Sequence, residues 1–162
     1  MNALKAIFSI LFLMLCLMAC KDEEAELART LSVEKKSLAC EMERLKLKSD
    51  SLWDEMGVYL DKNLPTDMPL PERTNMVGIR SAHLIALFKA FPNLDTAIQI
   101  KVNEAGKADN NIAEQMKAVM DKMHDAERGM NEALQKIETQ SKQHYQILKL
   151  ELQELEKQPC RS

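Results

Sequence analysis

The chain has few aromatic residues and few glycines: phenylalanine, tyrosine and tryptophan make up 4% of its 162 residues, and only four glycines occur. It also lacks a basic excess, since 22 lysines and arginines stand against 25 aspartates and glutamates. A net charge of −3 offers no positive surface to a phosphate backbone, so we do not expect nucleic-acid binding. The bulk is Leu, Met, Ala, Glu, Lys and Gln, which favour helices, and it predicts an all-α protein.

Catalytic signatures are absent as well. The sequence has no GxSxG, P-loop or HExxH pattern and no cysteine and histidine spaced as a catalytic dyad. It also has no CxxC and no other cysteine and histidine spacing typical of a zinc site. We therefore expect a protein that is not an enzyme and that has no cofactor.

The N-terminus carries an apolar run that is too short to cross a membrane. The run from Ala6 to Ala19 has 14 residues, whereas a spanning helix needs about 20. It follows one positive charge, Lys5, and ends on a small residue just before Cys20. This order is typical of a secretory signal peptide, so we assign residues 1–19 to a cleaved signal.

The residues at the predicted cut, Leu17-Met18-Ala19-Cys20, resemble the lipobox of bacterial lipoproteins. The resemblance implies that the Cys20 thiol receives a diacylglycerol, that the signal is cut before Cys20, and that a fatty acid such as palmitate acylates the new amine. Two or more acyl chains anchor a protein stably. We therefore expect a protein attached to the cell envelope through lipid, at the outer membrane.

The four residues after the cysteine, Lys21-Asp22-Glu23-Glu24, resemble the surface-export signal of Bacteroidota-type lipoproteins. This second resemblance implies exposure on the cell surface. The alternative interpretation is a solvated acidic tether. We assign residues 20–26 to such a tether in either case.

Two of the four cysteines remain for other roles, since Cys16 would leave with the signal and Cys20 would carry the lipid. The outer compartment is oxidising. A disulfide between Cys40 and Cys160 is one prediction, and it would tie the C-terminus to the first helix. Free thiols and an intermolecular disulfide are the alternatives.

Residues 27–162 are predicted to form a single helical domain that begins with a long helix over 27–63. One apolar stripe recurs every seven residues, as in a coiled coil or a long bundle helix: Leu31, Leu38, Leu45, Leu52 and Tyr59. A second stripe on the opposite face repeats likewise: Val33, Cys40 and Leu47. The second stripe predicts either contacts with more than one helix, a dimer surface, or apolar residues tolerated at the surface.

Three prolines interrupt the helical pattern and predict a rigid link over 64–71. The next stretch, 72–91, is apolar almost all round, which is typical of a short buried helix. Residues 96–103 alternate as a strand does, but no second strand candidate exists to pair with them. We therefore expect a helix there as well.

A C-terminal helical region is predicted over 94–158, with a weak or broken turn at 106–111 and one long helix over 111–157. Together with the first helix, this helix predicts an elongated helical hairpin, or coiled-coil-like bundle, around the short middle helix. Such a protein would bind a protein partner or a second copy through its helix seams, as a scaffold or spacer.

One group of soft ligands occurs on the last helix at spacings of three and four: Met116, Met120, Met123 and His124. Thioethers beside an imidazole suit Cu(I). Methionine also fills gaps in helix seams, and core packing is the interpretation that we favour over a metal site. Met-rich helical surfaces suit adaptable apolar partners too, so a chaperone-like binder of an apolar client or small ligand is a further alternative.

Overall fold

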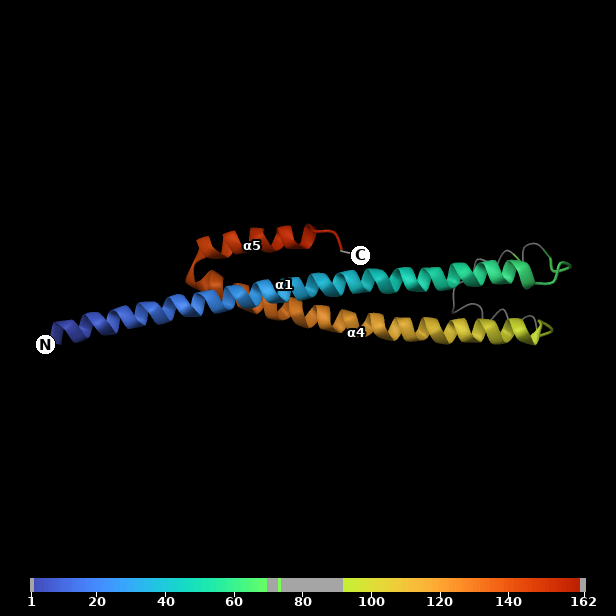
Figure 1. Cartoon of the computed structure of the whole chain (residues 1–162), viewed down its shortest axis with the longest axis horizontal. Coiled ribbons are helices and arrows are strands. Elements are labelled where there is room, and N and C mark those ends of the chain that lie inside the picture. Colours follow the sequence, from blue (N-terminus) through green and yellow to red (C-terminus); the bar gives the residue numbers. More distant parts are fainter. Residues whose placement is uncertain (1, 70–72, 74–91, 161–162) are drawn as a thin grey trace. The chain divides into compact units, whose positions relative to one another are not determined.

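The structure is a computed structural model of the full chain. It describes the backbone of residues 2–69, 73 and 92–160, and within these ranges the side chains from residue 23 onwards. Three α-helices lie in this part of the chain (Figure 1): α1 (Asn2–Asn63), α4 (Thr96–Gln140) and α5 (Lys142–Lys157). The all-α prediction is confirmed. The predicted buried helix over 72–91 lies outside the described residues, apart from Arg73.

Proline ends α1 where the sequence predicts the link. The N–H of Leu64 still donates to the carbonyl of Leu60 at 2.9 Å, in the helical pattern. Pro65 has no N–H and cannot continue that pattern. The N–H of Met68 then donates to the carbonyl of Pro65 at 3.2 Å, which closes a turn immediately after the helix.

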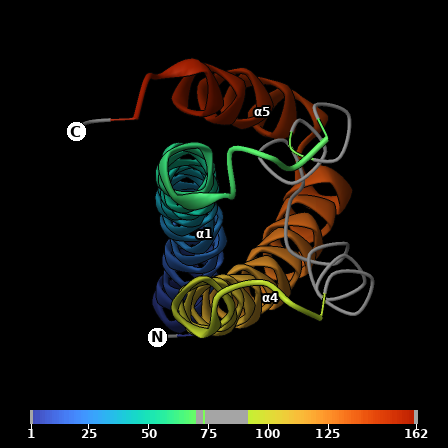
Figure 2. The ribbon, with the colours of Figure 1, turned by 90° about the vertical axis from the view of Figure 1, so that its right-hand side faces the viewer.

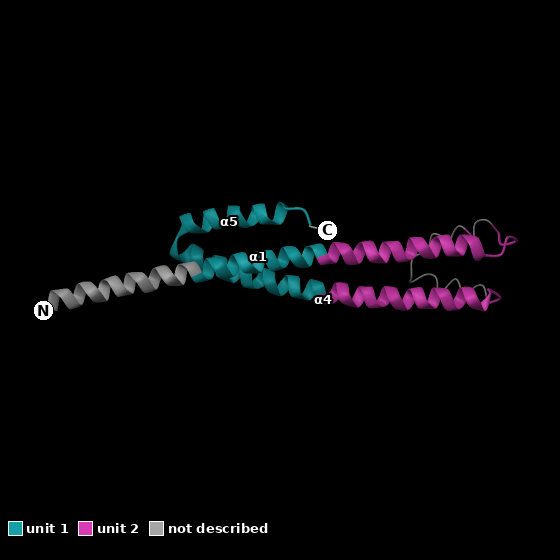
Figure 3. Ribbon diagram, in the orientation of Figure 1, with its two compact units in different colours: residues 1–40, 119–162 teal, residues 41–118 magenta. Residues whose placement is uncertain are grey.

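The chain divides into two compact units that share α1 and α4 (Figure 3). Unit 1 contains residues 1–40 and 119–162, and unit 2 contains residues 41–118. Each unit has its own cluster of buried apolar side chains. The prediction of a single helical domain over 27–162 did not anticipate this division.

Unit 2 pairs the end of α1 with the beginning of α4. Ser49 Oγ donates to Asp109 Oδ1 at 2.7 Å. The cluster between the two segments takes four residues from α1 and its end, and four from the start of α4 and the turn before it: Trp53, Met56, Leu60 and Leu64, and Leu94, Ile98, Val102 and Ala105. These positions recur every three or four residues, as one buried face of a helix requires.

Unit 1 contains three helical segments, because α5 packs beside α1 as a separate third helix (Figure 2). Its cluster combines small residues of α1 with larger residues of α4 and α5: Ala25 and Ala28, Met130, Ala133 and Ile137, and Leu148 and Leu152. The small alanines let neighbouring helices approach α1 closely.

The seven-residue stripe of α1 is only partly buried. Leu38 and Leu45 are buried, whereas Leu31, Leu52 and Tyr59 are partly buried at the edges of the two clusters. A straight α-helix has 3.6 residues per turn, so a strict seven-residue repeat drifts by about 20° per heptad. Over the four heptads from Leu31 to Tyr59 the stripe therefore rotates across the packed face, and only its middle positions are buried.

The prediction of one helix over 111–157 is wrong at Ser141. The helix α4 ends at Gln140, and Ser141 has an extended backbone with φ −156° and ψ 105°. Its side-chain oxygen accepts the N–H of His144 at 3.3 Å, so Ser141 caps the N-terminus of α5. This break brings Leu148 and Leu152 into the cluster of unit 1, where they are buried.

The predicted turn at 106–111 is also wrong, since α4 runs without interruption through this segment. The expected helix over 96–103 is confirmed. A glycine inside a helix costs about 1 kcal/mol relative to alanine. Here Val102, Ala105 and Ile112 are buried on both sides of Gly106. Keeping them on one helical face outweighs that cost.

Candidate functional site

The predicted lipidation site, Cys20, lies within α1, and its side chain is outside the described residues. Among the described side chains, contacts with the other helices begin at Glu24. Lys136 Nζ donates to Glu24 Oε1 at 2.8 Å, and the next residue, Ala25, is only 2% exposed. Glu24 and Ala25, at the C-terminal end of the predicted tether over 20–26, thus contribute to the packing of unit 1.

Charged groups attach α5 to α1 beyond that point. The Arg29 guanidinium binds the Glu151 carboxylate through two hydrogen bonds, Nε to Oε1 at 2.8 Å and Nη2 to Oε2 at 3.1 Å. These bonds lower the pKa of Glu151 below its ordinary value, because they favour its charged form. Further along, Lys36 Nζ donates to the carbonyl oxygen of Glu156 at 3.0 Å.

Lys35 joins all three helical segments of unit 1. Its Nζ lies 3.2 Å from Glu127 Oε1 on α4 and 3.3 Å from Glu156 Oε1 on α5. Partial burial acts to lower the pKa of Lys35, but the hydrogen bonds and charges of the two glutamates outweigh it, and the pKa is raised. A half-buried cation between two acids favours one arrangement of these helices.

Cys40 and Cys160 form a disulfide in the structure, with an S–S distance of 2.02 Å and a Cα–Cα distance of 5.4 Å. They are the two cysteines that remain when Cys16 and Cys20 are set aside. The bond lies within unit 1. It ties Cys160, two residues after the C-cap of α5 at Gln158, to Cys40 on α1. Together with the ion pairs, it fixes α5 along its length.

The four candidate copper ligands share α4 but differ in exposure. Met116 and Met123 are half-buried, Met120 is 46% exposed, and His124 is exposed. Only Met120 and His124, one turn apart, are both on the solvent side. Among the described residues, no group of three or more His, Cys, Asp or Glu side chains is placed to hold a metal ion.

Exposed aliphatic side chains occur on both units. Val33 and Leu47, from the second predicted stripe, are 55% and 63% exposed. The stripe therefore makes no buried seam within the described part of the chain. Sequence reasoning missed a similar pair on α5, Ile147 and Leu150, although a helical projection places them opposite the buried Leu148 and Leu152.

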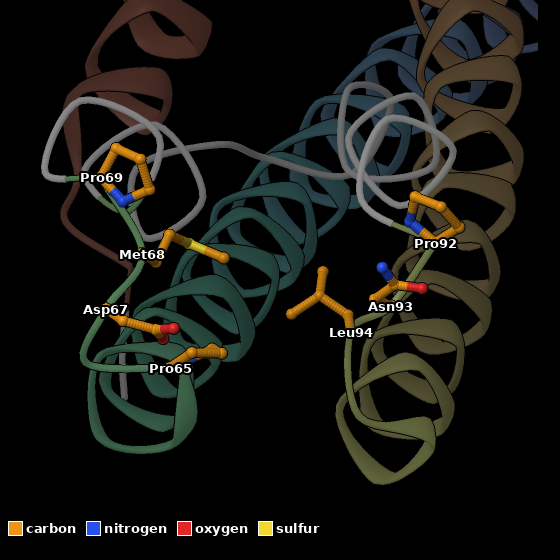
Figure 4. A pocket seen from close by; sticks show the side chains of 7 residues that line it. All are labelled: Pro65, Asp67, Met68, Pro69, Pro92, Asn93 and Leu94. Carbon is orange, nitrogen blue, oxygen red and sulfur yellow. The ribbon is translucent and has the colours of Figure 1, made fainter.

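A pocket of about 330 Å³ lies in unit 2, where the proline-containing link and the segment before α4 meet (Figure 4). Its described lining residues are Pro65, Asp67, Met68, Pro69, Pro92, Asn93 and Leu94. They include one carboxylate and no second acid, base or nucleophile. The described lining therefore has the polarity of a small apolar binding site without a catalytic pair.

Two shallow grooves of about 320 and 380 Å³ also lie between α1 and α4 in unit 2. They share Leu52, Glu55 and Ala108, so the two grooves adjoin. Apolar side chains such as Met56 and Ile112 line them, together with charged groups such as Glu55 and Lys101. This combination suits an apolar segment of another chain.

Neither a protein-family model, nor a curated protein, nor a solved structure matches this chain. In the part of the chain for which side chains are described, no helix is both long enough and apolar enough to span a bilayer.

Proposed function

We propose that this protein is a lipoprotein of the cell envelope, held at the outer membrane by acyl chains on Cys20, and that it acts as a non-catalytic scaffold or spacer. The observation that carries the proposal is the lipobox-like sequence Leu17–Cys20, followed within a few residues by side chains that pack into a helical unit. The Cys40–Cys160 disulfide supports it, because structural disulfides persist in oxidising compartments.

The partner is a protein, either another envelope component or a second copy of the chain. Ile147 and Leu150 lie three residues apart on the solvent side of α5 and are 59% and 63% exposed. Full burial of such a side chain contributes about 1.5–3 kcal/mol. A pair of them therefore gives a helical partner a useful part of its binding energy.

Lipid attachment is tested by expressing the full chain and its Cys20→Ala variant in a bacterium fed with labelled palmitate. The wild type should incorporate the label and sediment with membranes, whereas the variant should do neither. Formation of the Cys40–Cys160 disulfide in both proteins, followed by its shift on reducing gels, shows that the variant has folded. An unmodified Cys20 in the wild type contradicts the proposal.

Partner binding is tested by crosslinking in intact cells. Replacing Ile147 and Leu150 by Glu should remove the crosslinked species, because a charge opposes burial of this face. The matched control replaces Gln146 and Gln153, which are exposed on the same helix, by Glu. Loss of the species in both double variants, or in neither, argues against α5 as the contact.

A second function, Cu(I) binding, is favoured by one observation: Met120 and His124 are both exposed and lie one helical turn apart. Soft thioether and imidazole ligands suit this ion. Titration with Cu(I) in competition with a chelator should show a site that the Met120→Leu/His124→Gln variant loses and the His144→Gln variant keeps. Equal binding by all three proteins removes this function.

Binding of an apolar client is the remaining alternative, and the groove lined by Leu52 and Ala108 in unit 2 favours it. An unfolded outer-membrane protein should then raise the denaturation temperature of the chain or be kept soluble by it. Replacing Ala108 by Glu should reduce both effects. No change with any apolar client excludes this reading.

A further inference from the structure

The register of α1 against α4 is fixed in unit 1 by two contacts. A Cβ placed on Gly129 would lie 3.0 Å from Leu31 Cδ1, and Lys136 Nζ lies 2.8 Å from Glu24 Oε1. In both pairs the residue numbers add to 160. Antiparallel helices keep that sum constant, because both rise by about 1.5 Å per residue.

Extending this register by four residues places Gln140, the last residue of α4, level with the backbone of Cys20. The corner between α4 and α5 follows at once. In Figure 3 this corner lies beside the turn of α1 at which the teal colour of unit 1 begins. Unit 1 therefore has one end at the height of the predicted lipid attachment.

That height lies inside a lipid bilayer's polar layer. A bilayer of about 40–45 Å has a hydrocarbon core of about 30 Å, which leaves roughly 5–8 Å of headgroups on each side. Acyl chains on Cys20 enter the core, so the Cys20 backbone sits near its boundary. Glu24, which already contacts Lys136, is only about 6 Å further along the helix axis.

The chemistry of the corner suits headgroups. Residues 139–143 read Thr-Gln-Ser-Lys-Gln, with no acidic and no aliphatic side chain. All are exposed except Ser141, which is half-buried and caps α5. Hydroxyl, amide and ammonium groups hydrogen-bond phosphate and ester oxygens without entering the hydrocarbon.

We propose that the α4–α5 corner, residues 139–143, is a membrane-contact surface that rests on phospholipid headgroups, so that unit 1 stands on the bilayer by this end. The inference rests on the proposed lipid anchor at Cys20. It adds that the lipid holds a rigid unit directly, since only three residues separate Cys20 from Glu24, the first described side chain that contacts another helix.

The test uses the purified, lipidated full chain in phosphatidylcholine vesicles that contain a headgroup-labelled quencher lipid. A fluorophore is attached to Gln140→Cys or Gln153→Cys, two exposed glutamine positions, with the Cys40–Cys160 disulfide intact. Gln153 lies twelve residues after Ser141, the cap at the centre of the corner, which is about 18 Å along α5. The probe at position 140 should therefore be quenched at least about twofold more strongly.

Two controls complete the test. Without lipid, the Cys20→Ala form of either labelled protein should show no quenching. A flexible insertion of ten Gly and Ser residues after Lys21 should abolish the difference between the probes, because it lifts the corner away from the headgroups.

Weak quenching at both positions of the lipidated protein overturns the inference, because neither end of unit 1 then lies near the headgroups. Equally strong quenching at both positions overturns it too, because the unit then lies flat on the bilayer. Mass spectrometry of Cys20 separates these outcomes from failure of the anchor itself, since a chain without acyl groups contradicts the proposed function first.

Discussion

Two glycines of α4 differ in what surrounds them, and this difference is visible only in the structure. A Cβ at Gly129 would lie 3.0 Å from Leu31 Cδ1, whereas nothing lies within 4 Å of a Cβ at Gly106. Both positions are helical, so sequence alone assigns them the same cost. In unit 1 the glycine permits the close approach of a partly buried leucine from α1.

We expect Gly106→Ala to stabilise the protein by about 0.5–1 kcal/mol, because alanine has the higher helix propensity and meets no neighbour. Gly129→Ala should gain less or destabilise, because the Leu31 side chain must move by a few tenths of an ångström. Urea denaturation of both variants and the wild type measures the two free energies. An equal gain in the free energy of unfolding in both variants would show that the Leu31 side chain moves without an energetic cost.

Ser141 determines an entire element, since it separates α4 from α5. Replacing it by alanine removes the oxygen that accepts the His144 N–H and should cost about 1 kcal/mol of folding free energy, within a usual range of 0.5–2. Thr139→Ala is the matched control. Its hydroxyl donates to the Lys136 carbonyl within α4 at an exposed position and does not contact α5 in this bond. Thermal denaturation measures the midpoint temperature of each variant. An equal decrease in both variants contradicts the capping role of Ser141.

The attachment of α5 should also depend on pH. The folded-state pKa of Glu151 is lowered by the hydrogen bond from Arg29. Its contribution to stability is therefore complete above the ordinary pKa of 4.5 and is lost as pH falls through the folded value. Because the pair is partly exposed, we expect about 1 kcal/mol or less.

Denaturation curves of the wild type and Glu151→Gln, measured between pH 7 and 3, check this dependence. The wild type should be the more stable protein at pH 7, and the difference should shrink as the solution is acidified. Lys35 has the opposite sign: its raised pKa gives a contribution that is present below 10.5 and is lost at higher pH. A constant difference across the acidic range would exclude Glu151 as the titrating group.

Sequence reasoning predicted helices better than it predicted where they end. Pro65 stopped α1 as expected, because proline acts through its own missing N–H. Ser141 falls inside the helix predicted over 111–157, because a serine cap and a serine within a helix look alike in sequence until the next segment is known to fold back. The ion pairs of Lys35 could not be predicted from the sequence either, because its partners lie 92 and 121 residues away in the chain.

At the scale of the whole molecule, the described residues form two buried clusters within the single helical domain predicted over 27–162. The buried residues of unit 2 come from α1 after residue 41 and from the link and α4 before residue 118, and those of unit 1 come from both ends of the chain. A sequence read in order gives no sign of this division, since α1 and α4 pass from one unit to the other without a break. The two units can therefore differ in stability.

The disulfide acts at this scale because Cys40 and Cys160 are 120 residues apart, and the loop between them contains all of unit 2. Closing a loop of about 100 residues in the unfolded chain is worth roughly 4–5 kcal/mol in the entropic account, and measured effects are commonly about 2–5. We expect the Cys40→Ala/Cys160→Ala variant to lose stability in this range. If unit 2 keeps structure after unit 1 unfolds, the effective loop is shorter and the loss of stability falls toward the lower value.

Denaturation of the wild type with and without a reductant should reproduce the effect of the variant, while the variant itself should not respond to the reductant. Equal stability of oxidised wild type and variant would mean that the ion pairs of Arg29 and Lys35 alone hold α5 in place.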